Sequence, residues 1–209
     1  MRVYLDLDNT LLATRVFYHE FYRELLLAEG NTEREIDMSY TFFANGATLL
    51  GEAFSPRRQM EILGWREVTK ERVLAAIENI LREKRGFIFP EVVTVLMELR
   101  RRGATLILLT FGNEEFQKQK IIASGIAHHF DEIKVTGGDK TEIVLGDREG
   151  EAIVFVDDKV EFMERLSERK DIQTFHMCRR EIEEPLCEKG QCLAEHEIES
   201  LEELLRFIP

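Results

Sequence analysis

Two aspartates one residue apart, Asp6 and Asp8, directly follow the β-prone run from Val3 to Leu5. Because side chains alternate between the faces of a strand, both carboxylates would point the same way if the strand continues through Asp8. Two negative charges that close repel each other unless a cation or a shared proton lies between them. The pair therefore predicts a site for Mg2+ or another hard cation with oxygen ligands, in preference to a solvated strand end.

Three later apolar runs also end in polar side chains. Thr110 follows a second predicted strand, Lys140 a third, and the acidic pair Asp157 and Asp158 a fourth. Taken singly, Thr110 suits a turn and Lys140 a solvated surface charge. Taken together, these residues supply carboxylates for a metal, and a hydroxyl and an ammonium for the oxygens of an anion.

The composition limits the class of partner. The chain has 209 residues, with 40 acidic and 28 basic side chains and a formal charge of −12. This balance argues against a nucleic acid polymer or an anionic membrane as partner, so a small anion would need local positive charge or metal. Three cysteines, an odd number, predict reduced thiols. The lack of a long apolar run or a signal-peptide pattern predicts a cytoplasmic protein without a membrane span.

The order of the expected elements predicts the fold class. After Pro90, helical segments alternate with short apolar runs, which are typical of parallel strands covered on both faces. The expected strands are 104–109, 133–136, 152–156 and 172–176. We expect an α/β fold with a doubly wound parallel sheet, whose site lies at the carboxyl ends of the strands. A loop should follow the last strand, before a closing helix opened by Ser200 and Glu203 as a capping box.

The stretch from Thr14 to about Arg85 has helical periodicity and no strand pattern. Its helix signals are a stop at Gly30, a capping box of Thr32 and Glu35, an N-cap at Ser55 before Pro56, and an amphipathic helix over 69–84. It predicts a helical insertion between the first strand and the rest of the sheet. We interpret its aromatic residues as the core of the insertion: Phe17, Tyr18, Phe21, Tyr22, Phe42 and Phe43.

These motifs resemble those of the haloacid dehalogenase (HAD) superfamily. Asp6-Leu7-Asp8-Asn9-Thr10 matches its first motif in full, Leu108-Leu109-Thr110 its second, Lys140 its third, and Phe155-Val156-Asp157-Asp158 its fourth, in the family's order. The third motif is weak by itself, and its lysine has alternatives in Lys118, Lys120 and Lys134. The resemblance implies a Rossmann-like core of residues 1–14 and 88–209, with an α-helical cap at 15–87.

The resemblance also implies a reaction. A phosphatase of this superfamily would use Asp6 as the nucleophile that becomes an aspartyl-phosphate, and Asp8 as the acid and base. Mg2+ would be held by Asp6, the backbone carbonyl of Asp8 and Asp158, with Asp157 orienting a bound water. Thr110 and Lys140 would hold the transferring oxygens. The implied substrate is a small phosphorylated metabolite.

Two further groups of residues have weaker signals. Arg57 and Arg58, near a helix N-terminus of the insertion, and Arg15, in the hinge, suit a second polar or anionic group of the substrate, although solvated charges are the simpler interpretation. The tail has enough donors for a tetrahedral zinc site, but no close-set cysteine pair, and we favour ordinary loop residues. These donors are His176, Cys178, Cys187, Cys192 and His196.

Other functions share parts of the pattern. A phosphomutase of the same superfamily would keep the aspartyl-phosphate for a second transfer, and nothing in the sequence excludes it. A receiver-like signalling domain or another non-catalytic phosphate-binding protein also combines acidic residues, Thr and Lys. Receivers place their acidic pair after the first strand, whereas the adjacent pair here, Asp157 and Asp158, comes late in the chain. A dehalogenase is disfavoured because that branch lacks the second aspartate, Asp8. The substrate and the oligomeric state are left open.

Overall fold

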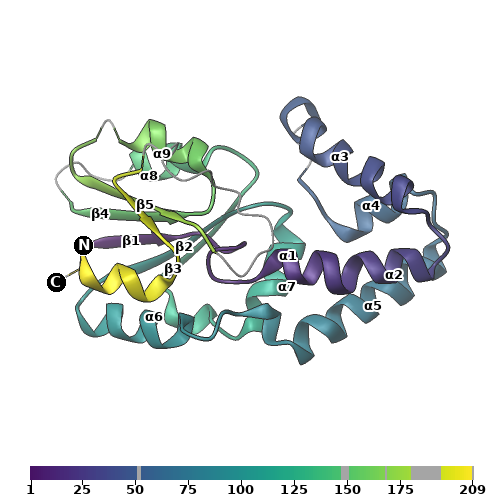
Figure 1. Ribbon diagram of the computed structural model, residues 1–209, viewed down its shortest axis with the longest axis horizontal. Helices are drawn as coiled ribbons and strands as arrows, with labels where there is room; N and C mark the ends of the chain where they lie inside the picture. The colour runs from purple at the N-terminus through teal and green to yellow at the C-terminus, as the bar shows by residue number, and fades with distance from the viewer. Residues whose placement is uncertain (51–52, 147–150, 168, 180–193, 209) are drawn as a thin grey trace.

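A six-stranded, fully parallel sheet forms the centre of the computed structural model, which describes residues 1–50, 53–146, 151–167, 169–179 and 194–208, without the side chains of 42–50. The strand order is β3-β2-β1-β4-β5-β6 (Figure 1). The predicted α/β fold with a doubly wound parallel sheet is confirmed. The strands are β1 (Arg2–Leu5), β2 (Thr105–Phe111), β3 (Glu132–Thr136), β4 (Ile153–Asp157), β5 (Ile172–Met177) and β6 (His196–Ile198).

The sixth strand corrects one expectation. We expected β5 to be the last strand and His196 to lie in a loop, but His196 pairs in register with Phe175 on β5. The strand has three residues in an acidic stretch, too short for an alternating pattern to be visible in the sequence.

The position of β1 in the middle of the sheet determines where the site lies. Leu5 pairs with Leu108 of β2 on one side and with Val156 of β4 on the other. The strand order reverses between β1 and β4, and such a switch point opens a crevice at the carboxyl ends of the strands. The condition that the first strand continues through Asp8 is not met, because β1 ends at Leu5 and Asn9 adopts a left-handed φ of 56°.

Helices cover both faces of the sheet (Figure 1). On one face α6 (Val92–Arg101), α7 (Glu114–Ser124) and the 3-10 helix η4 (Leu201–Arg206) pack on alternate residues of β1, including Val3 and Leu5. On the other face α8 (Lys140–Leu145) and α9 (Val160–Leu166) pack around Tyr4. The predicted capping box of Ser200 and Glu203 opens η4.

The described residues between β1 and α6 form helices and no strand. They are α1 (Thr14–Val16), the π-helical turn η1 (Phe17–Tyr22), α2 (Arg23–Ala28), α3 (Glu33–Leu50), α4 (Pro56–Ile62), α5 (Glu67–Glu83) and the 3-10 turn η2 (Arg85–Phe87); a further 3-10 turn, η3 (Ala127–His129), precedes β3. The predicted capping box of Thr32 and Glu35 is present, with the Thr32 N–H 2.8 Å from Glu35 Oε2. Ser55 caps α4 as predicted. In the described part of the chain no helix is both long and apolar enough to cross a membrane.

These helices have a hydrophobic cluster of their own. Phe17 and Tyr22 are buried in it, as expected for core aromatics, together with Phe116 from α7 of the sheet domain. The side chains of Phe42 and Phe43 lie outside the described residues. At the second connection to the sheet, Gly86 has φ 63°, and a Cβ there would lie 2.9 Å from the backbone nitrogen of Ser124 on α7. The connection therefore packs directly on α7, which only glycine allows.

Candidate active site

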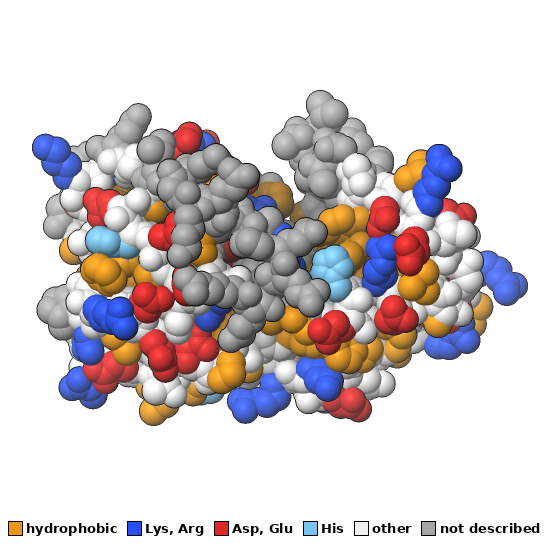
Figure 2. Space-filling model, in the orientation of Figure 1, with side chains coloured by type: hydrophobic (Ala, Val, Ile, Leu, Met, Phe, Trp, Pro, Cys, Tyr) orange, Lys and Arg blue, Asp and Glu red, His pale blue; other side chains and the backbone are white. Residues whose placement is uncertain are grey.

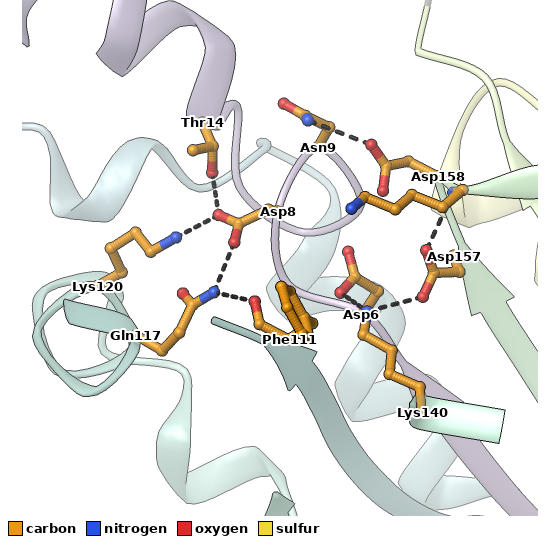
Figure 3. A network of polar contacts seen from close by, with 11 residues as sticks. Asp6, Asp8, Asn9, Thr14, Phe111, Gln117, Lys120, Lys140, Asp157 and Asp158 are labelled. Atoms are coloured by element: carbon orange, nitrogen blue, oxygen red, sulfur yellow. Dashed lines mark hydrogen bonds and ion pairs between the residues drawn. The ribbon is translucent and has the colours of Figure 1, made fainter. Parts of the chain in front are cut away.

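Asp6, Lys140 and Asp157 form a buried charged cluster at the carboxyl end of the central strands. The Lys140 ammonium forms an ion pair with the Asp6 carboxylate and lies 2.8 Å from Asp157 Oδ2 (Figure 3). Lys140 is the first residue of α8, where Asp139 caps the helix. Burial raises the pKa of Asp6, and the Asp157 and Asp158 carboxylates add to this while Lys140 opposes it.

Lys140 keeps its charge in this cluster. Burial acts against the ammonium form, but the Asp157 and Asp6 carboxylates prevail and raise the pKa of Lys140 above its usual value. The side chains of Lys140, Asp6 and Asp157 are only 3, 4 and 0% exposed. A cation held this firmly beside a carboxylate suits the binding of phosphoryl oxygens.

Asp158 lies next to this cluster with fewer partners. Its Oδ2 accepts a hydrogen bond of 3.2 Å from Asn9 Nδ2, whereas both oxygens of Asp157 are engaged, by Lys140 and by the Lys159 backbone N–H at 3.0 Å. Burial, followed by the charge of Asp157, raises the pKa of Asp158 to about 7. A carboxyl group with a raised pKa and spare oxygens is suited to binding a cation.

The donor set of Asp6, Asp157 and Asp158 fits a hard cation. One oxygen from each of these carboxylates lies within 4.8 Å of the other two. Three acidic side chains provide the oxygen ligands that Mg2+ prefers, and a divalent cation would offset the repulsion that raises the pKa of Asp6 and Asp158. The residues present therefore fit the magnesium ion expected from the sequence.

Thr110 lies near the end of β2, beside β1. Its side chain is fully buried, and its Oγ1 has no hydrogen-bond partner among the described residues. A buried hydroxyl without a partner loses free energy unless a ligand or water bonds to it. Thr110 is thus available to donate to an anion at the carboxyl edge of the sheet.

Asp8 has a separate set of partners, which the sequence did not predict. Its Oδ1 accepts from the Thr14 hydroxyl and forms an ion pair with Lys120, and its Oδ2 accepts from Gln117 Nε2 at 2.9 Å (Figure 3). Burial opposes ionisation, but Lys120, followed by Thr14 and Gln117, lowers the pKa of Asp8. The carboxylate of Asp8 thus has its own partners and is not one of the three acidic side chains, Asp6, Asp157 and Asp158, whose oxygens gather among the described residues.

The lysines considered for the third motif are separated by their contacts. Lys118 pairs with Glu114 at the surface, Lys134 pairs with Glu132, and Lys120 pairs with Asp8. Of these candidates, Lys140 alone contacts the carboxylate of Asp6 in the described part of the structure. The geometry thus supports Lys140 in the role that the resemblance gave it.

The two arginines of the cap lie in a different environment. Arg57, on α4, donates to Glu67 and Glu71 of α5, at 2.7 and 2.5 Å. Arg58 donates to Glu61 within its own helix at 3.1 Å. Both guanidinium groups pair with glutamates of α4 and α5, so contact with a substrate stays a prediction.

Several residues that support the site were not found from the sequence. Asn9 bridges two elements, since it donates to Asp158 and accepts from the Arg15 backbone N–H at 3.2 Å. From the far side, His176 Nε2 lies 3.1 Å from the backbone oxygen of Asp158, and Arg179 donates to the backbone oxygen of Thr10 at 2.6 Å. Of these three supporting residues, Asn9 alone had a signal in the local sequence, because asparagine adopts a positive φ more readily than most residues and so favours a turn.

The tail donors do not assemble as a zinc site in the described residues. His176, Cys178 and Glu197 lie close together, but Cys178 is disulfide-bonded and therefore has no thiolate for a metal. The expectation of reduced thiols is wrong for Cys178. The ring of His196 instead packs in a tilted arrangement against the rings of Phe175 and Phe207, at centroid distances of 4.8 and 4.2 Å. Cys187 and Cys192 lie outside the described residues.

Comparison with known proteins identifies the family. A family model described as haloacid dehalogenase-like hydrolase matches residues 2–172, which include every residue of the four motifs. The chain belongs to the haloacid dehalogenase-like hydrolase family. A curated relative, "Phosphoserine phosphatase" of Thermus thermophilus, is 40% identical over 68 residues; the match covers 32% of this chain and 27% of that protein. The shared segment is thus about a quarter of the relative.

Solved structures share the complete fold at low identity. A protein described as a haloacid dehalogenase-like hydrolase from Burkholderia xenovorans LB400 has a TM-score of 0.70 at 17% identity, with 98% of this chain and 94% of that chain covered. A HAD hydrolase of Bacillus subtilis, solved bound to magnesium, has a TM-score of 0.64 at 17% identity, with 99 and 98% covered. At these identities the likeness establishes the HAD fold over nearly the whole chain.

Proposed function

We propose that this HAD hydrolase is a Mg2+-dependent phosphomonoester hydrolase that acts on a small phosphorylated metabolite through an aspartyl-phosphate on Asp6. The observation that carries the proposal is the meeting of Asp6, Lys140 and the acidic pair Asp157 and Asp158 at one edge of the sheet. The segment shared with a phosphoserine phosphatase supports a phosphoester as substrate.

In the first half of the reaction, a carboxylate oxygen of Asp6 attacks phosphorus. The new bond joins this oxygen to phosphorus, the ester P–O bond breaks, and Asp8 gives a proton to the leaving alkoxide. Lys140 lies against Asp6 and neutralises charge on the phosphoryl oxygens, and the Thr110 hydroxyl donates to them. The product is an aspartyl-phosphate and an alcohol.

In the second half, water attacks the aspartyl-phosphate and Asp8 takes its proton, which releases inorganic phosphate and restores Asp6. The contacts of Asp8 favour its carboxylate form, which is the form that a base requires. The acid role requires a proton on Asp8, and the negative charge of a bound phosphoryl group raises the pKa of a nearby carboxyl group. The same residue can therefore serve in both halves.

The cation would be held by Asp6, Asp158 and the backbone carbonyl of Asp8, with Asp157 supporting them. When bound, it would neutralise the charge on the attacking carboxylate and on the phosphoryl group. This help is needed because the protein is acidic overall. Figure 2 shows acidic and basic side chains interspersed over the described part of the face drawn, so positive charge for the phosphate has to come from within the site.

The helical cap, residues 15–87, is proposed to select the substrate. Its helices surround their own hydrophobic cluster, and the groups with a chemical role in the proposal lie outside it. Binding energy from parts of the substrate remote from phosphorus can orient the reacting centre and exclude water. Arg57 and Arg58 are the proposed contacts in this region.

The test is a phosphatase screen over sugar phosphates, nucleotides and phosphoserine, with and without Mg2+. We expect Mg2+-dependent release of inorganic phosphate, and its loss in Asp6→Asn. Analysis of the organic product distinguishes hydrolysis from a mutase reaction, which would return an isomeric ester in place of phosphate. No turnover of any ester by the folded, Mg2+-loaded protein would argue for a non-catalytic phosphate-binding role.

A further inference from the structure

Two of the buried polar side chains of helix α7, Gln117 and Lys120, contact Asp8, and the proposed mechanism does not yet use them. Gln117 is 4% and Lys120 3% exposed, and the three-residue spacing places both on one side of the helix. Lys118, between them in sequence, is exposed and pairs with Glu114. A buried amide and a buried ammonium are costly unless each has a specific partner.

Both side chains bind Asp8, and each binds a different oxygen of it. Gln117 Nε2 lies 2.9 Å from Asp8 Oδ2 and 2.7 Å from the backbone oxygen of Phe111, while Lys120 forms its ion pair with Asp8 Oδ1 (Figure 3). The Lys120 ammonium also lies 5.0 Å from the centre of the Phe116 ring. Two partners on the two oxygens fix the rotation of the carboxylate as well as its position.

The orientation of the Gln117 amide is set by these contacts. Both partners of Nε2, the Asp8 carboxylate and the Phe111 carbonyl, are acceptors, so the NH2 group has to face them. Oε1 is left buried without a donor among the described residues. The orientation toward Asp8 is thus adopted even though the other half of the amide is unsatisfied, which costs free energy.

The backbone before α7 leaves room for this amide. Gly112 has φ 153°, and a Cβ at this position would lie 2.5 Å from Gln117 Nε2. A side chain at residue 112 would therefore push Gln117 away from Asp8. Residues 110–120 thus carry both the Thr110 hydroxyl, which has no partner among the described residues, and the two α7 side chains that hold Asp8.

We propose that Gln117 and Lys120 are positioning residues that hold the Asp8 carboxylate in place for proton transfer to and from the ester oxygen and water. The inference rests on the proposed phosphomonoesterase function. Asp6 and its cluster attack phosphorus, and the leaving oxygen lies roughly in line on the opposite side. Asp8 is the acidic group of the first motif whose carboxylate is held apart from that cluster. Its position is held by Gln117 and Lys120 of α7 together with the Thr14 hydroxyl, because β1 ends at Leu5 and does not fix it.

The test compares two esters that differ in their need for a proton. O-Phospho-L-serine has an alkoxide leaving group, and p-nitrophenyl phosphate leaves as a stable phenolate that hardly needs protonation. We expect Lys120→Met and Gln117→Leu to lower kcat/KM for the alkyl ester about tenfold or more, mainly through kcat, and for the aryl ester less than about threefold. Lys118→Met and Gln119→Leu, on the same helix, are the controls and should change neither.

A double mutant separates positioning from a general structural effect. If Lys120 acts through Asp8, Lys120→Met on an Asp8→Asn background should cause no further loss with the alkyl ester. Equal losses for both esters, or losses that multiply with that of Asp8→Asn, would overturn the proposal. Gly112→Ala is a second route if Lys120→Met does not fold, because it displaces Gln117 and should show the same selective loss. A wild-type protein that hydrolyses neither these two esters nor any sugar phosphate or nucleotide of the screen would instead refute the phosphomonoesterase function, and the positioning role with it.

Discussion

The Lys140 ammonium lies 2.8 Å from the Asp157 carboxylate, and both side chains are almost completely buried, at 3 and 0% exposure. Lys140 also pairs with Asp6, so this one cation stands among the carboxylates at the carboxyl end of β1 and β4. Removing one partner of a buried ion pair leaves an uncompensated charge, which is far more costly than the loss of a surface pair. Lys140 therefore contributes to the fold as well as to the proposed chemistry.

Lys140→Met should lower the free energy of unfolding by about 3–5 kcal/mol at neutral pH, because Asp6 and Asp157 lose their cation. It should also reduce turnover by about 100-fold or more through loss of charge on the phosphoryl oxygens. Part of the stability should return at pH 5, where the Asp6 carboxyl can bind a proton. Urea unfolding at the two pH values measures this. Lys134→Met, which removes a half-buried partner of Glu132, is the control.

Asp6→Asn should abolish phosphate release and leave the fold intact. The amide has nearly the same shape as the carboxylate but is a much weaker nucleophile, so no acyl phosphate can form. Phosphate release and circular dichroism on the same sample test both parts. Turnover near that of the wild type in a folded Asp6→Asn protein would rule out the covalent mechanism.

The metal-free protein should become less stable as pH rises from about 4 to about 7. Burial raises the pKa of Asp158 from its usual 3.8 to about 7, so between these values the folded chain holds a proton that the unfolded chain has lost. The folded state binds more protons in this window, and its stability falls as pH rises through it. The measurement is the Tm in EDTA across this range.

Adding Mg2+ should reverse that trend at pH 7 and above, because a cation favours the carboxylate form of Asp158 and binds only the folded site. Activity should be lost in EDTA and restored by Mg2+. Asp158→Asn should abolish both the pH trend attributed to this residue and most of the stabilisation by Mg2+. Activity that survives complete removal of metal would contradict the assignment of Asp158.

The site shows which relationships a sequence can reveal. The strand ends at Asp6, Thr110 and Asp157 were predictable, because apolar runs mark parallel strands and parallel strands end at one edge. The partners of Asp8 were not, because Lys120 lies 112 residues away and its burial follows from how α7 packs. A lysine in a predicted helix is interpreted as a solvated charge, because lysine is rarely buried without a partner and the sequence does not show the partner.

Contacts between distant segments also explain why the structure differs from the sequence-based expectations at β1 and β6. The common direction of Asp6 and Asp8 depended on β1 continuing through Asp8, but the chain turns at Asn9, which bonds both to Asp158 and to Arg15. The short strand β6 depends on pairing with β5 and not on its own residues. Local patterns identified the helices and the sheet, whereas contacts between distant segments decided how the carboxylates proposed to be catalytic are held.

The last prediction concerns the cap. Arg57 pairs with Glu67 and Glu71, all on the surface, so releasing it to a substrate costs little. Arg57→Ala and Arg58→Ala should therefore change the ranking of kcat/KM among sugar phosphates, nucleotides and phosphoserine. The kcat/KM for p-nitrophenyl phosphate, which has no hydroxyl, carboxylate or second phosphate group remote from phosphorus, should change by less than about threefold. Arg72→Ala is the matched control, since Arg72 is also an exposed cap arginine paired with a glutamate, Glu29. If the ranking is the same in all three variants, these arginines do not contact the substrate, and specificity has to come from other cap residues, the loops of the core or the tail.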